Sequence, residues 1–191
     1  MRRIQYFIWA LPGLLLVVGS GGLVAQHAGH QATAAWAATA SVKSADGRTV
    51  GEARLRQTTN GVLVHLALTD APSGIHALHL HTVGRCDAPS FESAGEHFNP
   101  SGAGHGFDAA KGPHAGDLPN LHVPPSGDLE VEMLAAHATL ARGPASLLDA
   151  DGSALVLHAS PDDYTSDPAG NAGARVACGV LAAAGSQPMS R

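Results

Sequence analysis

Histidine is unusually concentrated in the middle of this chain. The 191 residues include 12 His, all of them after residue 26, and seven lie between His76 and His122. Histidine is the commonest metal ligand in proteins and titrates near neutral pH. Neither an apolar core nor an ordinary surface requires so many imidazoles in one stretch. The sequence therefore predicts a metal site in this region.

The composition fits one domain with a core of mostly aliphatic residues. Hydrophobic residues make up 45% of the chain and aromatic residues only 4%, so Val, Leu and Ala must fill most of the core. Gly (23) and Pro (12) are abundant, which favours turns and long loops over long helices. The formal net charge is −5 and there is no basic stripe, so nucleic acid is not an expected partner.

Short segments of strand length predict an all-β fold. Asp46-Gly47 and Asn60-Gly61 are strong turn signals between such segments. Because the sequence has neither a long amphipathic helix nor a strand–helix alternation, we expect an antiparallel sandwich or barrel. The expected strands are residues 39–43, 50–57, 62–68, 75–83, 129–134, 154–158 and 175–184.

Two long segments between these strands lack strand patterning. Residues 84–127 form a loop far longer than compact domains usually contain, and such loops are typically functional or disordered. This loop contains several of the histidines, so we expect it to be functional. A second loop, residues 159–174, separates the last two expected strands.

Two histidines on an expected strand are placed to share one metal. His79 and His81 are two residues apart, and side chains at i and i+2 of a strand point to the same face. His158 ends a later strand and can complete a copper site with them, since imidazole suits copper. A His-x-His pair alone is weak evidence, because chance produces it often.

The long loop supplies a second set of ligands. His97, His105, His114 and Asp117 follow one another within it. Three imidazoles and one carboxylate would make a closed, tetrahedral zinc site. The alternative is that these are four solvated polar residues in a loop.

The N-terminus has the organisation of an export signal. Arg2 and Arg3 precede an apolar run, and small residues lead to a plausible cleavage site after Ala25. We therefore expect residues 1–25 to be a signal peptide; an uncleaved membrane anchor is the alternative. Residues 26–34 are expected to be a linker, and residues 186–191 a loose tail. The linker contains His27 and His30, whose role the sequence leaves open.

The chain contains only two cysteines, Cys86 and Cys178. In an oxidising compartment two cysteines usually pair. Export therefore favours a disulfide over two unrelated buried thiols.

Four separate stretches give the chain a specific resemblance. They are residues 74–81 (GIHALHLH), 95–100 (GEHFNP), 114–119 (HAGDLP) and 170–179 (GNAGARVACG). In this order they resemble a copper–zinc superoxide dismutase of the bacterial, exported type. The resemblance spans roughly residues 35–181 and implies a domain over residues 35–185. It also implies a Greek-key antiparallel β-barrel or sandwich of about eight strands, with a long metal-binding loop and a second active-site loop.

The resemblance also implies roles for individual residues. The implied copper ligands are His79, His81, His97 and His158, and the implied zinc ligands are His97, His105, His114 and Asp117, with His97 bridging both metals. Arg175 matches the arginine that guides the anion to copper. Asp162 matches the carboxylate that joins His79 to His105, and His76 a histidine that supports the site by hydrogen bonding. Cys86 and Cys178 match the family's disulfide.

The function implied is dismutation of superoxide to oxygen and hydrogen peroxide, with copper and zinc as cofactors. An exported copper-binding or copper-buffering protein without catalysis is the alternative on the same fold. We expect a periplasmic or otherwise exported protein, without stable membrane association if the signal is cleaved, and a homodimer is left open. The second loop contains no Lys, so the lysine-rich steering loop of animal members of the resembled family is absent.

Overall fold

The computed structural model describes residues 35–185. The predicted signal peptide (1–25), linker (26–34) and tail (186–191) lie outside the described residues. Within them, the chain is almost entirely strand and loop, and one 3-10 turn, η1 (Glu92–Ala94), is the only helical element. The strands are β1 (Ala38–Ser44), β2 (Thr49–Thr58), β3 (Gly61–Leu68), β4 (Gly74–His76), β5 (Leu78–His81), β6 (Leu121–Val123), β7 (Leu129–Ala135), β8 (Ala154–His158), β9 (Arg175–Val180) and β10 (Ala182–Ala183).

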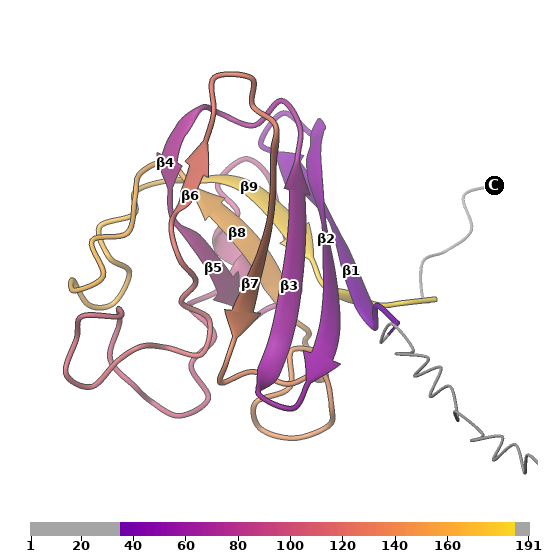
Figure 1. Ribbon diagram of the computed structural model, residues 1–191, viewed down its shortest axis with the longest axis vertical. Coiled ribbons are helices and arrows are strands. Elements are labelled where there is room, and N and C mark those ends of the chain that lie inside the picture. The colour runs from indigo at the N-terminus through magenta and orange to yellow at the C-terminus, as the bar shows by residue number, and fades with distance from the viewer. Residues whose placement is uncertain (1–34, 186–191) are drawn as a thin grey trace, which may run out of the picture. The chain divides into compact units, whose positions relative to one another are not determined.

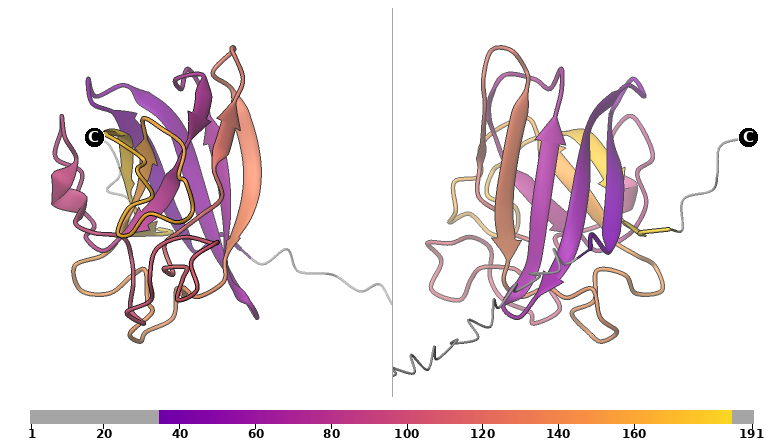
Figure 2. Two further views of the ribbon diagram at one scale, coloured as in Figure 1. Left: turned by 90° about the vertical axis from the view of Figure 1, so that its left-hand side faces the viewer. Right: turned by 45° about the vertical axis from the view of Figure 1, so that its right-hand side comes forward.

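The strands form one large antiparallel sheet and one small one. The large sheet has the order β5-β8-β9-β1-β2-β3-β7, with β10 also paired to β1, and β4 pairs with β6 separately. Strand β7 returns beside β3 only after the chain has formed β4, β5 and β6 elsewhere, which is a Greek-key connection. Figures 1 and 2 show β5, β8 and β9 behind β1, β2, β3 and β7, so the sheet curls over its core. The predicted all-β fold is confirmed.

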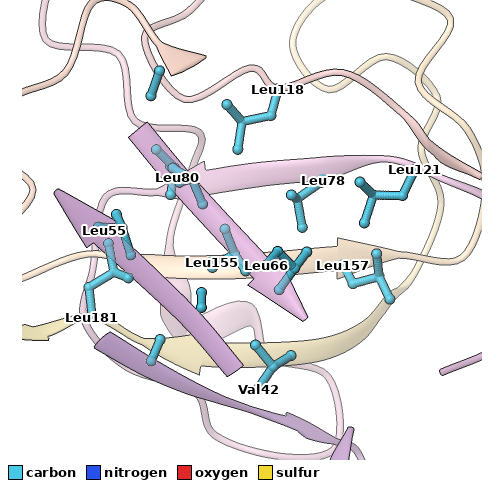
Figure 3. Close-up of a cluster of buried hydrophobic side chains, with 14 of the residues drawn as sticks. Val42, Leu55, Leu66, Leu78, Leu80, Leu118, Leu121, Leu155, Leu157 and Leu181 are labelled. Atoms are coloured by element: carbon cyan, nitrogen blue, oxygen red, sulfur yellow. The ribbon is translucent and has the colours of Figure 1, made fainter. Parts of the chain in front are cut away.

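The core lies inside this curl and is built mainly of leucine, alanine and valine. Figure 3 shows Leu55 of β2, Leu66 of β3, Leu80 of β5 and Leu155 of β8 converging, and all four side chains are almost completely buried. Because neighbouring residues of a strand point to opposite faces, the inward leucines of β5 leave His79 and His81 pointing away from this core.

The single strand expected at residues 75–83 is wrong in one respect, because it is interrupted at Ala77. Its two halves have different partners: β4 pairs with β6, whereas β5 pairs with β8. The Ala77 N–H donates to the Ser160 carbonyl (2.9 Å), and the Ala77 carbonyl accepts from the N–H of His158 (2.9 Å). At Ala77 the chain therefore leaves the small sheet and enters the large one.

Two further boundaries differ from the sequence expectation. Strand β6 lies inside the segment that was expected to be irregular, and its three residues are too few to show a pattern. The expected strand at residues 175–184 is interrupted at Leu181, whose N–H donates to the Ser153 carbonyl (2.9 Å). Strands β9 and β10 therefore flank a single residue that bonds outside the ladder.

The predicted disulfide between Cys86 and Cys178 is present. It joins the start of the long loop to β9, across a sequence separation of 92 residues. Among residues 35–185, no helix is long and apolar enough to cross a membrane.

Candidate metal centre

Strands β5 and β8 bring three histidines together beneath the loops. His79 and His81 of β5 are fully buried, and His158 ends β8, the strand that pairs with β5. The Nε2 atoms of His158 and His81 are 3.4 Å apart. With His97 these residues form a set whose ligand atoms all lie within 4.8 Å of one another. We call this set of four the four-histidine cluster.

A second set, the His–Asp cluster, lies beside it and consists of His97, His105, His114 and Asp117. Asp117 Oδ1 is 3.0 Å from His97 Nδ1 and 3.2 Å from the Nδ1 atoms of both His105 and His114. The Nδ1 atoms of His97 and His114 are 3.4 Å apart. A tetrahedron around zinc with bonds of about 2.0–2.1 Å has edges of about 3.3–3.4 Å. The spacing of this cluster therefore fits a zinc ion at its centre.

His97 belongs to both clusters. Its Nδ1 faces Asp117, while its Nε2 is buried without a hydrogen-bond partner. Its ring centroid lies 4.0 Å from that of His79. The backbone holds it there, since the N–H of Thr82 donates to Glu96 (2.9 Å) and that of Phe98 to Leu80 (2.8 Å). The segment around His97 therefore runs alongside β5 in fixed register.

The carboxylate of Asp162 joins the two clusters from outside. It accepts hydrogen bonds from Nε2 of His79 (2.7 Å) and from Nε2 of His105 (3.0 Å). A neutral imidazole that donates from Nε2 has its lone pair on Nδ1. Asp162 thus directs the Nδ1 lone pair of His79 into the four-histidine cluster and that of His105 into the His–Asp cluster. Partners of this kind fix ligand tautomer and orientation.

Asp117 uses its two oxygens differently. Oδ2 accepts the backbone N–H groups of Gly106 and His114, each at 2.9 Å, which leaves Oδ1 facing the three imidazoles. Burial raises the pKa of Asp117, but hydrogen bonds from His105, His97 and Gly106 outweigh burial and lower the pKa well below its usual range. The carboxylate is therefore ionised, as a metal ligand must be.

Asn120, which is not among the site residues predicted from the sequence, holds Asp162 in place. Its side-chain amide donates to the Asp162 carbonyl (2.9 Å), and its Oδ1 accepts from the Asp162 N–H (2.8 Å). Its own N–H donates to the Tyr164 hydroxyl (2.7 Å). Asn120 thus pairs with both backbone groups of Asp162, 42 residues away in sequence. No local pattern marks an asparagine for such a role.

Gly170 leaves the space that the Asp162 carboxylate occupies. A Cβ atom at this position would lie 1.9 Å from Asp162 Oδ1 and 2.6 Å from His105 Nε2. The φ angle of +60° also favours glycine. Gly170 lies in the last stretch of the family resemblance, but the clash that requires glycine is visible only in three dimensions.

Arg175 is fixed next to the four-histidine cluster. Its guanidinium donates from Nη1 to the Phe91 carbonyl and from Nη2 to the Gly95 carbonyl, both at 2.8 Å. The Gly95 carbonyl also accepts from His81 Nδ1 (2.9 Å). One backbone oxygen therefore orients both a candidate copper ligand and the arginine.

His76 lies outside both clusters. Its Nδ1 donates to the backbone carbonyl of His158 (2.8 Å), and its side chain is buried. It therefore contacts the backbone of a candidate ligand and not the ligand atoms.

Burial keeps the imidazoles of β5 and β8 neutral. It lowers the pKa of His81 to about 2, that of His158 to about 3 and that of His79 to about 4. His105 behaves differently: burial lowers its pKa, but hydrogen bonds to Asp117 and Asp162 together with their charges outweigh burial and raise the pKa to about 9. The two clusters therefore differ in the protons that they hold at neutral pH.

Comparison with known proteins places the chain in a family. Residues 49–181 match the copper/zinc superoxide dismutase family. The chain is 46% identical over 144 residues to copper–zinc superoxide dismutase 1 of Aquifex aeolicus, covering 74% of this chain and 85% of the relative. It is 42% identical over 147 residues to the copper–zinc superoxide dismutase of Caulobacter vibrioides, with 75% and 84% covered.

A solved structure shows the same likeness. The crystal structure of a superoxide dismutase-like protein from Bacillus subtilis matches with a TM-score of 0.75 and 37% identity, covering 78% of this chain and 100% of that chain. The chain belongs to the copper–zinc superoxide dismutase family. It is an enzyme of this type, which acts on superoxide with copper and zinc as its cofactors.

The two clusters should release different numbers of protons when they bind their metals. At pH 7 His105, with its pKa near 9, carries a proton that zinc must displace, because a ligating imidazole is neutral. The histidines of low pKa have none to lose. We expect zinc loading of the metal-free protein to release about one proton more than copper loading. Calorimetry in buffers of different ionisation enthalpy measures this, and equal release for both metals would contradict it.

Replacing Asn120 should weaken the His–Asp cluster. In Asn120→Ala the Asp162 backbone loses two hydrogen bonds, so its carboxylate no longer orients His105 firmly. Loss of such a support typically costs about 10–100-fold in metal affinity. Competition with a chromophoric zinc chelator measures the change. Asn60→Ala, in the exposed turn between β2 and β3, is the matched control and should leave zinc affinity unchanged.

Proposed function

We propose that dismutation proceeds through copper held by the four-histidine cluster, with zinc at the His–Asp cluster in a structural and electrostatic role. The observation that carries this proposal is the position of His97, whose two ring nitrogens face different clusters. Copper would supply reversible one-electron transfer, by which one superoxide is oxidised to oxygen and a second, with two protons, is reduced to hydrogen peroxide.

The chemistry of the two donor sets supports this division. Four imidazole nitrogens suit copper, whereas three imidazoles and one carboxylate make a closed zinc set. Unpartnered buried nitrogens support it as well. His79 Nδ1 and His97 Nε2 are buried polar atoms without a hydrogen-bond partner, an arrangement that costs free energy unless a ligand contacts them.

His97 is suited to handle a proton. Its Nδ1 belongs to the His–Asp cluster, so with Nδ1 holding zinc the ring would carry a proton at Nε2, the nitrogen that faces the four-histidine cluster. From Nε2 the proton can pass to a substrate anion that is being reduced. Asp117 and the backbone of the adjacent segment keep the ring in place throughout.

Arg175 supplies positive charge beside the four-histidine cluster. Burial lowers its pKa from the usual 12.5, but an arginine side chain remains protonated in proteins. Its guanidinium donates to two neutral carbonyl groups, and no carboxylate of residues 35–185 forms an ion pair with it. A fixed, unneutralised guanidinium is suited to attract and orient a small anion.

We also propose that the protein is exported, to the periplasm or beyond. The charged and apolar organisation of residues 1–25 supports this, as does the Cys86–Cys178 disulfide, since structural disulfides form in oxidising compartments.

A second candidate function is copper binding without catalysis. It is favoured by similarity to the superoxide dismutase-like protein of Bacillus subtilis (strain 168), 40% identical over 139 residues, with 71% of each chain covered. We favour dismutation because this chain has both clusters and the arginine together. The absorption of the copper-loaded protein and its bleaching by superoxide would separate the two functions.

Replacing the shared imidazole of His97 should impair both metal sites. In His97→Ala both clusters lose a ligand, so we expect loss of most dismutase activity and weaker binding of both copper and zinc. Metal content and dismutation between pH 5 and 9 are measured together. The matched control is His122→Ala, on the exposed side of β6, which should resemble the wild type. Full activity of His97→Ala across this pH range would exclude the bridging role.

Replacing Arg175 should slow the reaction with superoxide without loss of copper or zinc. Arg175→Ala removes the guanidinium but no ligand, so we expect roughly a tenfold or greater fall in the rate constant for superoxide with copper and zinc retained. The measurement is dismutation by protein of known metal content. Loss of metal would instead assign Arg175 a structural role.

A further inference from the structure

Asp167 places an exposed carboxylate against the outside of the His–Asp cluster. Its Oδ1 accepts the backbone N–H of His105 (3.1 Å) and lies 4.0 Å from Nε2 of His114. The Asp167 side chain is 69% exposed, whereas both histidines are buried. Of the carboxylates that pair with histidines of the two clusters in residues 35–185, this is the one that solvent reaches.

The ring of His114 has carboxylates on the same two sides as the ring of His105. In both, Nδ1 lies 3.2 Å from Oδ1 of Asp117, on the side where the metal fits. Nε2 of His105 donates to Asp162 (3.0 Å), and Nε2 of His114 faces Asp167. This last contact is electrostatic, because 4.0 Å is longer than a hydrogen bond. A carboxylate beside Nε2 favours the proton on that nitrogen, so the lone pair stays on Nδ1, toward the metal.

Contacts between the two long loops bring Asp167 to the cluster. The carbonyl of Tyr164 accepts the N–H of Asp108 (3.1 Å), and its ring packs against Phe107 with centroids 5.2 Å apart. Gly106 leaves space for this contact, because a Cβ atom there would lie 2.0 Å from the Tyr164 carbonyl oxygen. Figure 1 shows both loops on the same side of the domain. The position of Asp167 is therefore set by the backbone of its loop.

The ligands of the His–Asp cluster balance only half the charge of a zinc ion. Asp117 is the one anionic ligand, since imidazoles bind a metal in their neutral form. Asp162 adds negative charge from the buried side and Asp167 from the exposed side. Asp167 thus offsets part of the charge of a bound cation at the side that faces solvent.

We propose that Asp167 is a positioning residue of the zinc site, which retains zinc in the His–Asp cluster by holding the backbone of His105 and the ring of His114 from the solvent side. This inference rests on the assignment of zinc to that cluster in the proposed function. Neither histidine belongs to the four-histidine cluster, so zinc is affected and copper is not. Salt screens the charge of an exposed carboxylate over about 10 Å at 0.1 M, whereas the hydrogen bond to His105 persists.

The test follows the loss of zinc from the copper- and zinc-loaded protein into an excess of a chromophoric chelator. Asp167→Ala removes both contacts, and Asp167→Asn removes the charge but keeps an oxygen that can accept from His105. Asp167→Asn carries the test should Asp167→Ala fail to fold. Asp128→Asn, in an exposed position directly before β7, is the matched control for net charge. Rates are measured at ionic strengths of about 0.02 and 0.5 M, between which the screening length falls about fivefold.

A second measurement separates positioning from a general loss of stability. Cobalt(II) is bound in place of zinc, and its visible absorption is recorded, because the geometry of the ligands determines the bands of a transition metal ion. A variant that is merely less stable would keep the wild-type bands. A variant in which the rings of His105 and His114 are displaced would not.

We expect zinc to leave Asp167→Ala about tenfold faster than the wild type, with shifted cobalt bands and unchanged copper content. Asp167→Asn should lose zinc about threefold faster at low ionic strength and at nearly the wild-type rate at high ionic strength. Asp128→Asn should follow the wild type in every measurement.

Wild-type rates of zinc loss in both Asp167 variants would overturn the proposal. So would wild-type cobalt bands in Asp167→Ala, an equal change in Asp128→Asn, or an equal loss of copper. A wild-type protein that takes up no zinc would instead refute the proposed function.

Discussion

The hydrogen bonds from His79 and His105 to the carboxylate of Asp162 determine how the two clusters face each other. Both histidines donate from Nε2, so both present Nδ1 inward. Without that carboxylate each ring could turn or change tautomer, and the ligand atoms would no longer converge. Asp162 in turn depends on its surroundings, because Asn120 binds its backbone on both sides and Gly170 leaves room for its oxygens. One ionic group thus connects two loops and one strand.

Because side chains alternate along β5, this strand buries residues on both of its faces. Leu78 and Leu80 enter the apolar core, whereas His79 and His81 point to the opposite side, where the long loops cover them. All four residues are buried. This explains why the imidazoles are neutral: they lie beneath loops and behind a packed sheet, away from water. The same strand therefore contributes to stability with one face and to the metal centre with the other.

Much of this organisation could be predicted from the sequence. Turn pairs such as Asn60-Gly61 and alternating residues located most strands, because these signals are local. The four stretches at residues 74–81, 95–100, 114–119 and 170–179, taken in this order, pointed to the copper–zinc superoxide dismutase family. The interruption at Ala77 was missed, since it results from two halves of one segment pairing with different strands. Asn120 was missed for a similar reason: its partner is distant in sequence, and an asparagine before a short strand has no distinctive pattern.

The two clusters differ in how far their ligands are spread along the chain, and this has a consequence for assembly. All ligands of the His–Asp cluster lie in one loop, between His97 and Asp117, so closing that cluster requires only a short segment to fold back. The four-histidine cluster needs His158, which arrives only after β7 and β8 have been made. Long-range closures cost more chain entropy and form more slowly than local ones. A nascent chain can thus gather the first set of ligands well before the second, so the four-histidine cluster is the last part of the centre to be completed.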